Sequence, residues 1–266
     1  MFNVIALAHP TWGTAAPFVV FGALLGALGV AYNRLMVVFL DLADRYARVP
    51  PEVSAGVIGG TVGFCLFIDD NLVGGGDVLN QRVLTHTDVT MALVAILGLR
   101  ACLGPLCYAA GTPGGIFAPL LLVGAVGGTL FADTANHLWP GAGLDPVAFA
   151  IVGMSTFFTA VVRAPLTGIV LIMEMTATTS QAVPMLGAAA SAVLVATVLK
   201  GEPIYDTLRL RMLRTHAADA SSECAERSRT VADAFAARPF GARTRRTPLR
   251  SRCVEPTIGR WQRSTG

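Results

Sequence analysis

Charged residues are scarce in this sequence. Asp, Glu, Lys and Arg make up 14% of its 266 residues, whereas soluble domains carry roughly 25%. Hydrophobic residues make up 53%, and the mean hydropathy is +0.60. This deficit of charge argues against a soluble globular protein and predicts a polytopic integral membrane protein.

Residue groups that would build a catalytic or metal site are also missing. The five cysteines show no metal-binding or redox spacing, and the four histidines are scattered. Cys102 and Cys107 fall inside an apolar segment, where a free thiol packs as a small hydrophobic group. No Ser/His, Asp/Asp or metal-ligand constellation occurs in the apolar segments, so we predict neither an enzyme nor a cofactor. Met1–Val4 lack basic residues, and we expect no cleavable signal peptide.

The apolar segments differ in length and are broken by Gly and Pro. Ala15 to about Leu42 and residues 90–110 are long enough to cross a bilayer core of about 30 Å, whereas residues 165–176 are too short. Irregular backbone at membrane depth is tolerated only inside protein or beside a cavity, and transporters build ion sites from broken helices. We therefore predict an all-α fold with broken and re-entrant helices. The remaining helices are expected at 53–68, 116–133, 146–161, 182–199 and 204–214, with a short surface helix at 77–87.

The stretch 111–119 reads Gly-Thr-Pro-Gly-Gly-Ile-Phe-Ala-Pro and lies between two apolar segments. It contains no His and no carboxylate, but Gly111, Gly114 and Gly115 let the backbone approach a ligand closely. Pro119 fits the first turn of the helix that follows. Because a helix N-terminus exposes unpaired N–H groups and about half a positive charge, we predict an anion site made from backbone.

The segment Gly115-Ile116-Phe117-Ala118-Pro119 resembles the GxFxP signature of the CLC family of chloride channels and chloride/proton antiporters. Further stretches agree with that family in order and spacing, and together they make the resemblance specific. It runs from about residue 15 to residue 215. The supporting stretches are Gly74-Gly75-Gly76, Val162-Arg163-Ala164-Pro165-Leu166-Thr167-Gly168, Leu171-Ile172-Met173-Glu174-Met175-Thr176 and Glu202-Pro203-Ile204-Tyr205.

The resemblance covers the second half of a CLC subunit, which is built as an inverted repeat. The family's first half carries a GSGIP-type serine loop and a GREGP-type loop with the gating glutamate, and neither motif occurs in this sequence. We therefore expect the C-terminal half of a CLC-type fold in an N-terminally truncated member. The implied function is chloride transport, as a channel or as a chloride/proton antiporter. The alternative is a non-transporting fragment that is inactive or needs a separately encoded N-terminal half.

The resemblance also implies which residues bind chloride. The expected anion-binding residues are Gly115, Ile116, Phe117 and Tyr205. The backbone N–H groups of Ile116 and Phe117 match the family's ligands, and Tyr205 would donate its phenol O–H to the same ion. The ordinary alternatives are a glycine turn before a helix and an interfacial tyrosine. Supporting roles in the loop would fall to Gly111, Gly114, Ala118 and Pro119, and no metal is implied.

Three ionisable residues within the apolar segments have two interpretations each. Glu174 is a functional candidate by position, but we favour a polar contact near a helix end. Arg100 and Arg163 could add positive potential along an anion path, but the favoured interpretation is that they snorkel or pair with carboxylates or carbonyls.

The chain is expected to divide into a lead-in at 1–14, a CLC-type transmembrane domain at 15–215 and a basic tail at 216–266. The tail is rich in Arg without apolar periodicity, which predicts disorder; it is either natural or a frameshift product. The positive-inside rule places it in the cytoplasm, and we expect a bacterial inner-membrane protein. The expected partners are chloride, the lipid bilayer and, by resemblance, a second copy that contacts residues 165–199, with no nucleic acid.

Overall fold

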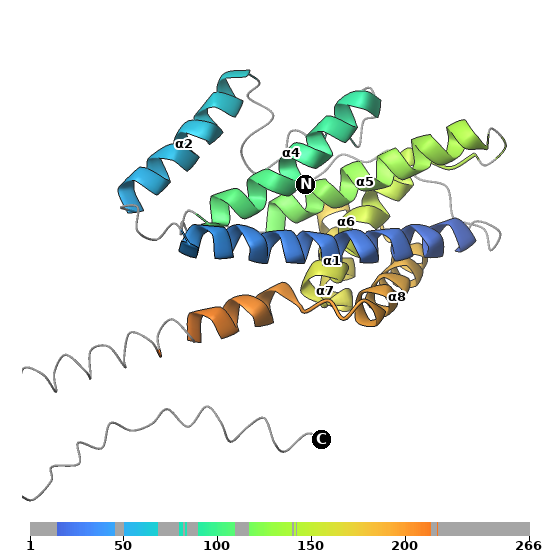
Figure 1. The fold of residues 1–266 in the computed structure, drawn as a ribbon. Helices are drawn as coiled ribbons and strands as arrows, with labels where there is room; N and C mark the ends of the chain where they lie inside the picture. The colour runs from blue at the N-terminus through green and yellow to red at the C-terminus, as the bar shows by residue number, and fades with distance from the viewer. Residues whose placement is uncertain are drawn as a thin grey trace, which may run out of the picture. The chain divides into compact units, whose positions relative to one another are not determined.

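The structure, a computed structural model, describes residues 15–45, 51–68, 80–81, 83, 90–109, 117–139, 141, 143–213 and 217. Its regular elements within these ranges are helices, so the all-α prediction is confirmed for this part of the chain. The chain divides into two compact units, Met1–Ile204 and Tyr205–Gly266. Figure 1 labels the helices of the first unit: α1 (Ala15–Arg45), α2 (Pro51–Ile68), α4 (Thr90–Ala109), α5 (Phe117–Leu138), α6 (Pro146–Val162), α7 (Pro165–Thr176) and α8 (Ala182–Val198).

Helix α6 forms the core of the first unit. Every residue from Ala148 to Val161 is buried, and the helix packs against α1, α5, α7 and α8. Asp145 caps its N-terminus by accepting a hydrogen bond from the Val147 N–H at 2.9 Å. The helix ends where Arg163 takes a left-handed conformation with φ 64°, and α7 begins two residues later at Pro165. The predicted break between these two short helices is therefore confirmed.

Helices α5 and α6 touch backbone to backbone. A Cβ added to Gly124 would lie 2.8 Å from the Met154 Cα, and a Cβ added to Gly128 would lie 2.8 Å from the Ala150 Cα. Real Cβ atoms do not approach so closely, so only glycine fits at both positions. Small residues allow helices to approach in this way and gain dispersion contacts along their length.

The turn between α5 and α6 is closed by one side chain. The Asn136 amide donates to the Leu144 carbonyl at 2.7 Å and accepts from the Leu144 N–H at 2.9 Å. Helix α5 reaches Leu138, so the predicted end of this helix at 133 is wrong. In this extension, the Thr134 hydroxyl donates to the Leu130 carbonyl at 2.7 Å, so this polar group has a partner within the helix.

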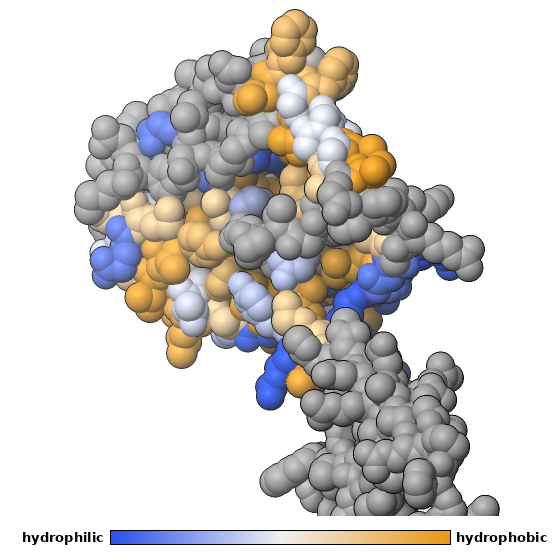
Figure 2. Space-filling view, turned by 90° about the vertical axis from the view of Figure 1, so that its left-hand side faces the viewer, coloured by the Kyte–Doolittle hydropathy of each residue, from blue (hydrophilic) through white to orange (hydrophobic). Residues whose placement is uncertain are grey.

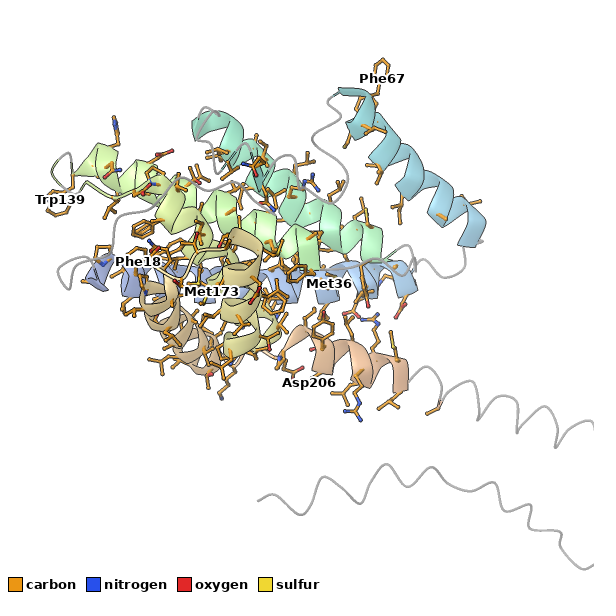
Figure 3. The ribbon with its side chains drawn as sticks, turned by 180° about the vertical axis from the view of Figure 1, so that it is seen from behind. Phe18, Met36, Phe67, Trp139, Met173 and Asp206 are labelled. Carbon is orange, nitrogen blue, oxygen red and sulfur yellow. The ribbon has the colours of Figure 1, made fainter. Side chains whose placement is uncertain are left out.

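Helix α1 uses glycine in the same manner. Gly22 and Gly26 lie against the backbone of Ala188 and Ala192 in α8, and Gly29 lies against Ala160 in α6. The sequence contains these three glycines at helical spacing, and each one marks a close approach. At one end of α1, the Phe18 ring, labelled in Figure 3, stacks on the Phe149 ring of α6 with centroids 4.3 Å apart.

Two of the helices are long and apolar enough to cross a membrane, namely Ala16–Arg45 and Phe117–Leu138. The predicted spanning segment at 90–110 is a helix, α4, whose described apolar part runs from Leu93 to Tyr108. It contains Pro105, and the helix continues through this residue. The short surface helix expected at 77–87 lies outside the described residues except at 80, 81 and 83, which are helical.

Large hydrophobic side chains are exposed on several helices of the first unit. The face drawn in Figure 2 carries many hydrophobic residues, with hydrophilic ones among them. Phe67, at the end of α2, is 88% exposed and points away from the other helices in Figure 3, and Trp139 is exposed at the end of α5. Exposed apolar surface of this extent is typical of contact with lipid or with another protein. Further examples are Val20, Leu24, Leu166, Val170, Val183, Leu194 and Val198.

The α5–α6 contact predicts a difference between two adjacent glycines. Gly128→Ala should lower the free energy of unfolding by about 1–3 kcal/mol, because the new methyl group would overlap the α6 backbone. Gly127→Ala meets only the flexible end of Leu25, at 3.4 Å, and alanine favours a helix by roughly 0.5–1 kcal/mol. Thermal unfolding in detergent compares the two variants. Equal stabilities would contradict the close backbone contact.

Candidate functional site

The predicted anion site is described in part, at the beginning of α5. The helix starts at Phe117, so Phe117, Ala118 and Pro119 form its first turn. The prediction that Pro119 lies in the first turn of a helix is therefore confirmed. The other loop residues of the prediction, Gly111, Gly114, Gly115 and Ile116, lie outside the described residues.

The first turn of α5 has the electrostatic character that an anion requires. The leading N–H groups of an α-helix have no carbonyl partner within the helix, and the aligned peptide dipoles concentrate about half a positive charge there. Pro119 has no backbone N–H group, so its position in the first turn carries no unpaired donor. The first turn of α5 contains no acidic residue that would offset this positive potential.

The beginning of α5 is anchored to the end of α6 by two aromatic rings. The Phe117 ring meets the Phe158 ring edge to face, with centroids 5.5 Å apart and planes at 77°. Phe158 is buried, and the residues after the first turn, from Leu120 to Val126, are buried as well. An edge-to-face pair has a preferred geometry, so the direction in which α5 begins depends on α6.

Tyr205 belongs to the second compact unit, within a helical stretch at 204–213. Its side chain is half-exposed. To share one chloride ion, the Tyr205 O–H group and the backbone N–H groups must each lie within hydrogen-bond distance of that ion. The pairing of Tyr205 with Ile116 and Phe117 around one chloride stays a prediction.

The ionisable residues of the apolar segments have different surroundings. Glu174 is exposed near the end of α7, and Arg100 is buried in α4. The guanidinium of Arg163 donates to the Gly201 carbonyl at 2.9 Å, so the interpretation that this arginine pairs with carbonyls is confirmed. Among the described residues, no group of three or more His, Cys, Asp and Glu could hold a metal ion.

A polar cluster around the segment 201–202, which we call the 201–202 clasp, was not predicted from the sequence. It consists of Asn33 and Arg163 with the carbonyls of Gly201 and Glu202. The Asn33 amide nitrogen donates to the Glu202 carbonyl at 2.9 Å and also to the Val161 carbonyl at 3.2 Å. A buried amide in an apolar segment needs a hydrogen-bond partner. The position of Asn33 within the first apolar segment could therefore have indicated such a cluster from the sequence.

A family profile described as "Voltage gated chloride channel" matches residues 1–197. The chain belongs to this family. Curated relatives agree. The H(+)/Cl(-) exchange transporter ClcA of Vibrio parahaemolyticus is 37% identical over 208 residues, which are 77% of this chain and 44% of the relative. The protein of the same name from Yersinia pestis is 35% identical over 199 residues, which are 74% of this chain and 42% of the relative.

Solved structures of the family share the helical arrangement. A slow cyanobacterial Cl−/H+ antiporter superimposes with a TM-score of 0.74 at 30% identity, over 80% of this chain and 50% of the other. A eukaryotic CLC transporter gives 0.61 at 25% identity, over 77% and 36%. The all-helical fold thus matches part of the CLC transporter structures. The chain spans less than half the length of the curated relatives that it matches.

Anchoring of α5 by Phe158 can be tested through stability. Phe158→Ala should lower the free energy of unfolding by about 3–5 kcal/mol, because a buried ring is lost and a cavity remains. The control is Phe67→Ala, which removes an 88% exposed ring in place of one that is 7% exposed and should change stability by less than about 0.5 kcal/mol. Chemical unfolding in detergent measures both. A Phe158 variant as stable as the Phe67 variant would contradict the anchoring contact.

Proposed function

We propose that this chain carries chloride across a membrane by a CLC-type pathway, as a channel or as a chloride/proton antiporter. The observation that carries the proposal is the start of α5 at Phe117, within the Gly115–Pro119 signature and without an acidic residue in the first turn. Membership of the family supports it. The relatives named as H(+)/Cl(-) exchange transporters favour the antiporter over the channel.

In this proposal the anion is held by dipoles. The N–H groups of Ile116 and Phe117 and the O–H group of Tyr205 point at one chloride, and the glycines of the loop give room for the ion to approach. Partial charges bind an anion well enough to admit it and weakly enough to release it, which conduction requires.

The proposed setting is a bacterial inner membrane with the C-terminal tail in the cytoplasm. The exposed apolar side chains of α1 and α2 support contact with lipid. We further propose a homodimer in which α7 and α8 contact the second copy. The support for this contact is the set of apolar side chains that these two helices expose, Leu166, Val170, Val183, Leu186 and Leu194.

A second function is favoured by the extent of the match. The chain spans 44% of the Vibrio parahaemolyticus relative, and the GSGIP-type and GREGP-type loops do not occur among its 266 residues. In this alternative the chain does not transport by itself and forms a pathway only together with a separately encoded polypeptide. Helix ends that face lipid without partners cost several kcal/mol each, and such a partner would cover them.

Chloride efflux from liposomes distinguishes the two functions. Liposomes that contain only this chain should release chloride faster than empty liposomes if the chain transports alone. Proton movement recorded in the same experiment separates the antiporter from the channel, because an exchanger drives protons against their gradient when chloride flows. Efflux equal to that of empty liposomes would exclude independent transport and favour the alternative.

The role of Tyr205 is tested by removing one oxygen atom. Tyr205→Phe should weaken chloride binding about ten- to a hundredfold, because a hydrogen bond from a neutral donor to an anion contributes roughly 1.5–3 kcal/mol. Tyr108→Phe, in α4, makes the same chemical change at a tyrosine that is not among the proposed ligands and serves as the control. Isothermal titration with chloride measures both. Unchanged affinity in Tyr205→Phe would remove this residue from the site.

A further inference from the structure

The connection after α8 is fixed at successive residues. Lys200 takes a left-handed conformation with φ 51°, and the Gly201 N–H donates to the Ala196 carbonyl at 3.0 Å. Gly201 lies so close to α1 that an added Cβ would be 2.6 Å from the Val30 Cγ2. Three residues further, Ile204 is completely buried. A segment without regular structure is thus held in one path.

Arg163 holds this segment from the α6–α7 corner. Its guanidinium donates through Nη1 to the Thr197 hydroxyl at 2.8 Å and through Nη2 to the Gly201 carbonyl at 2.9 Å. Its backbone is fixed as well, because its N–H donates to the Thr159 carbonyl at 2.8 Å and its φ is 64°. Because the backbone of Arg163 is fixed, its planar guanidinium binds the two acceptors with a defined geometry. The single ammonium group of a lysine could not reproduce this arrangement.

Asn33 holds the next residue from α1. The two hydrogens of its amide nitrogen serve the Val161 carbonyl at the end of α6 and the Glu202 carbonyl of the connection. Asn33 is buried, so water does not replace these bonds when the side chain is changed. The amide therefore joins the connection to the same end of α6 that carries Arg163.

We propose that Asn33 and Arg163 are positioning residues for the chloride site. They hold the carbonyls of Gly201 and Glu202, which precede Tyr205 by four and three residues in the sequence. The inference rests on the proposed function, in which Tyr205 binds chloride. Neither side chain touches the ion, and both act on it through the backbone before Tyr205.

Amide hydrogen exchange tests the clasp without chloride. In the full chain in detergent, Arg163→Gln and Asn33→Leu should raise the exchange rate of peptides covering 199–207 about tenfold. Arg34→Gln removes the same charge as Arg163→Gln from an exposed neighbour of Asn33 and should leave these rates unchanged. If Arg163→Gln fails to fold, Thr197→Val removes a single acceptor of the guanidinium and should give a smaller increase. Unchanged exchange at 199–207 would overturn the clasp.

Chloride titration tests whether the clasp acts through Tyr205. Arg163→Gln should weaken chloride binding about tenfold, Arg163→Lys should weaken it less, and Arg34→Gln should not change it. In the Tyr205→Phe background, Arg163→Gln should have no further effect, because the group that it positions is gone. Faster exchange with unchanged affinity, or an additive double variant, would overturn the positioning role. If the unsubstituted chain binds no chloride, the proposed site itself fails, and the exchange rates show separately whether the clasp holds.

Discussion

The backbone contact between α5 and α6 is the constraint on which the rest of the first unit depends. Gly124 and Gly128 bring the two helices so close that neither can rotate or slide without overlap. Helix α6 is buried from Ala148 to Val161, so it is the surface on which α1, α5, α7 and α8 are arranged. Its apolar side chains contribute burial on every side, whereas a helix at the surface buries one face.

The C-terminal end of α6 joins two features that are far apart in the sequence. Phe158 contacts Phe117 at the start of α5, and Arg163, at the end of the same helix, contacts the carbonyl of Gly201. The end of α6 therefore contacts both the first turn of α5 and the connection that follows α8. In a site made of dipoles, distances of a few tenths of an ångström decide the strength of binding, and a shared support reduces their variation.

Much of the fold is predictable from the sequence because apolar segments of this length become helices in a low-dielectric surrounding. The break at Arg163–Pro165 was predicted, since proline starts a helix more readily than it continues one. Pro105 shows the limit of that rule, because α4 continues through it. The contacts of Asn33 were not predictable: its partners lie 128 and 169 residues further along the chain, and no local pattern records them.

The Asn136–Leu144 pair, which closes the turn between α5 and α6, also bears on the order in which the helices assemble. Two helices that are neighbours in the chain meet at a small entropic cost, because the loop to be closed is short. Among the labelled helices, α1 is synthesised first and α8 last, yet these two pack against each other. During synthesis, Gly22 and Gly26 of α1 can therefore contact α8 only after α5 and α6 have both been made.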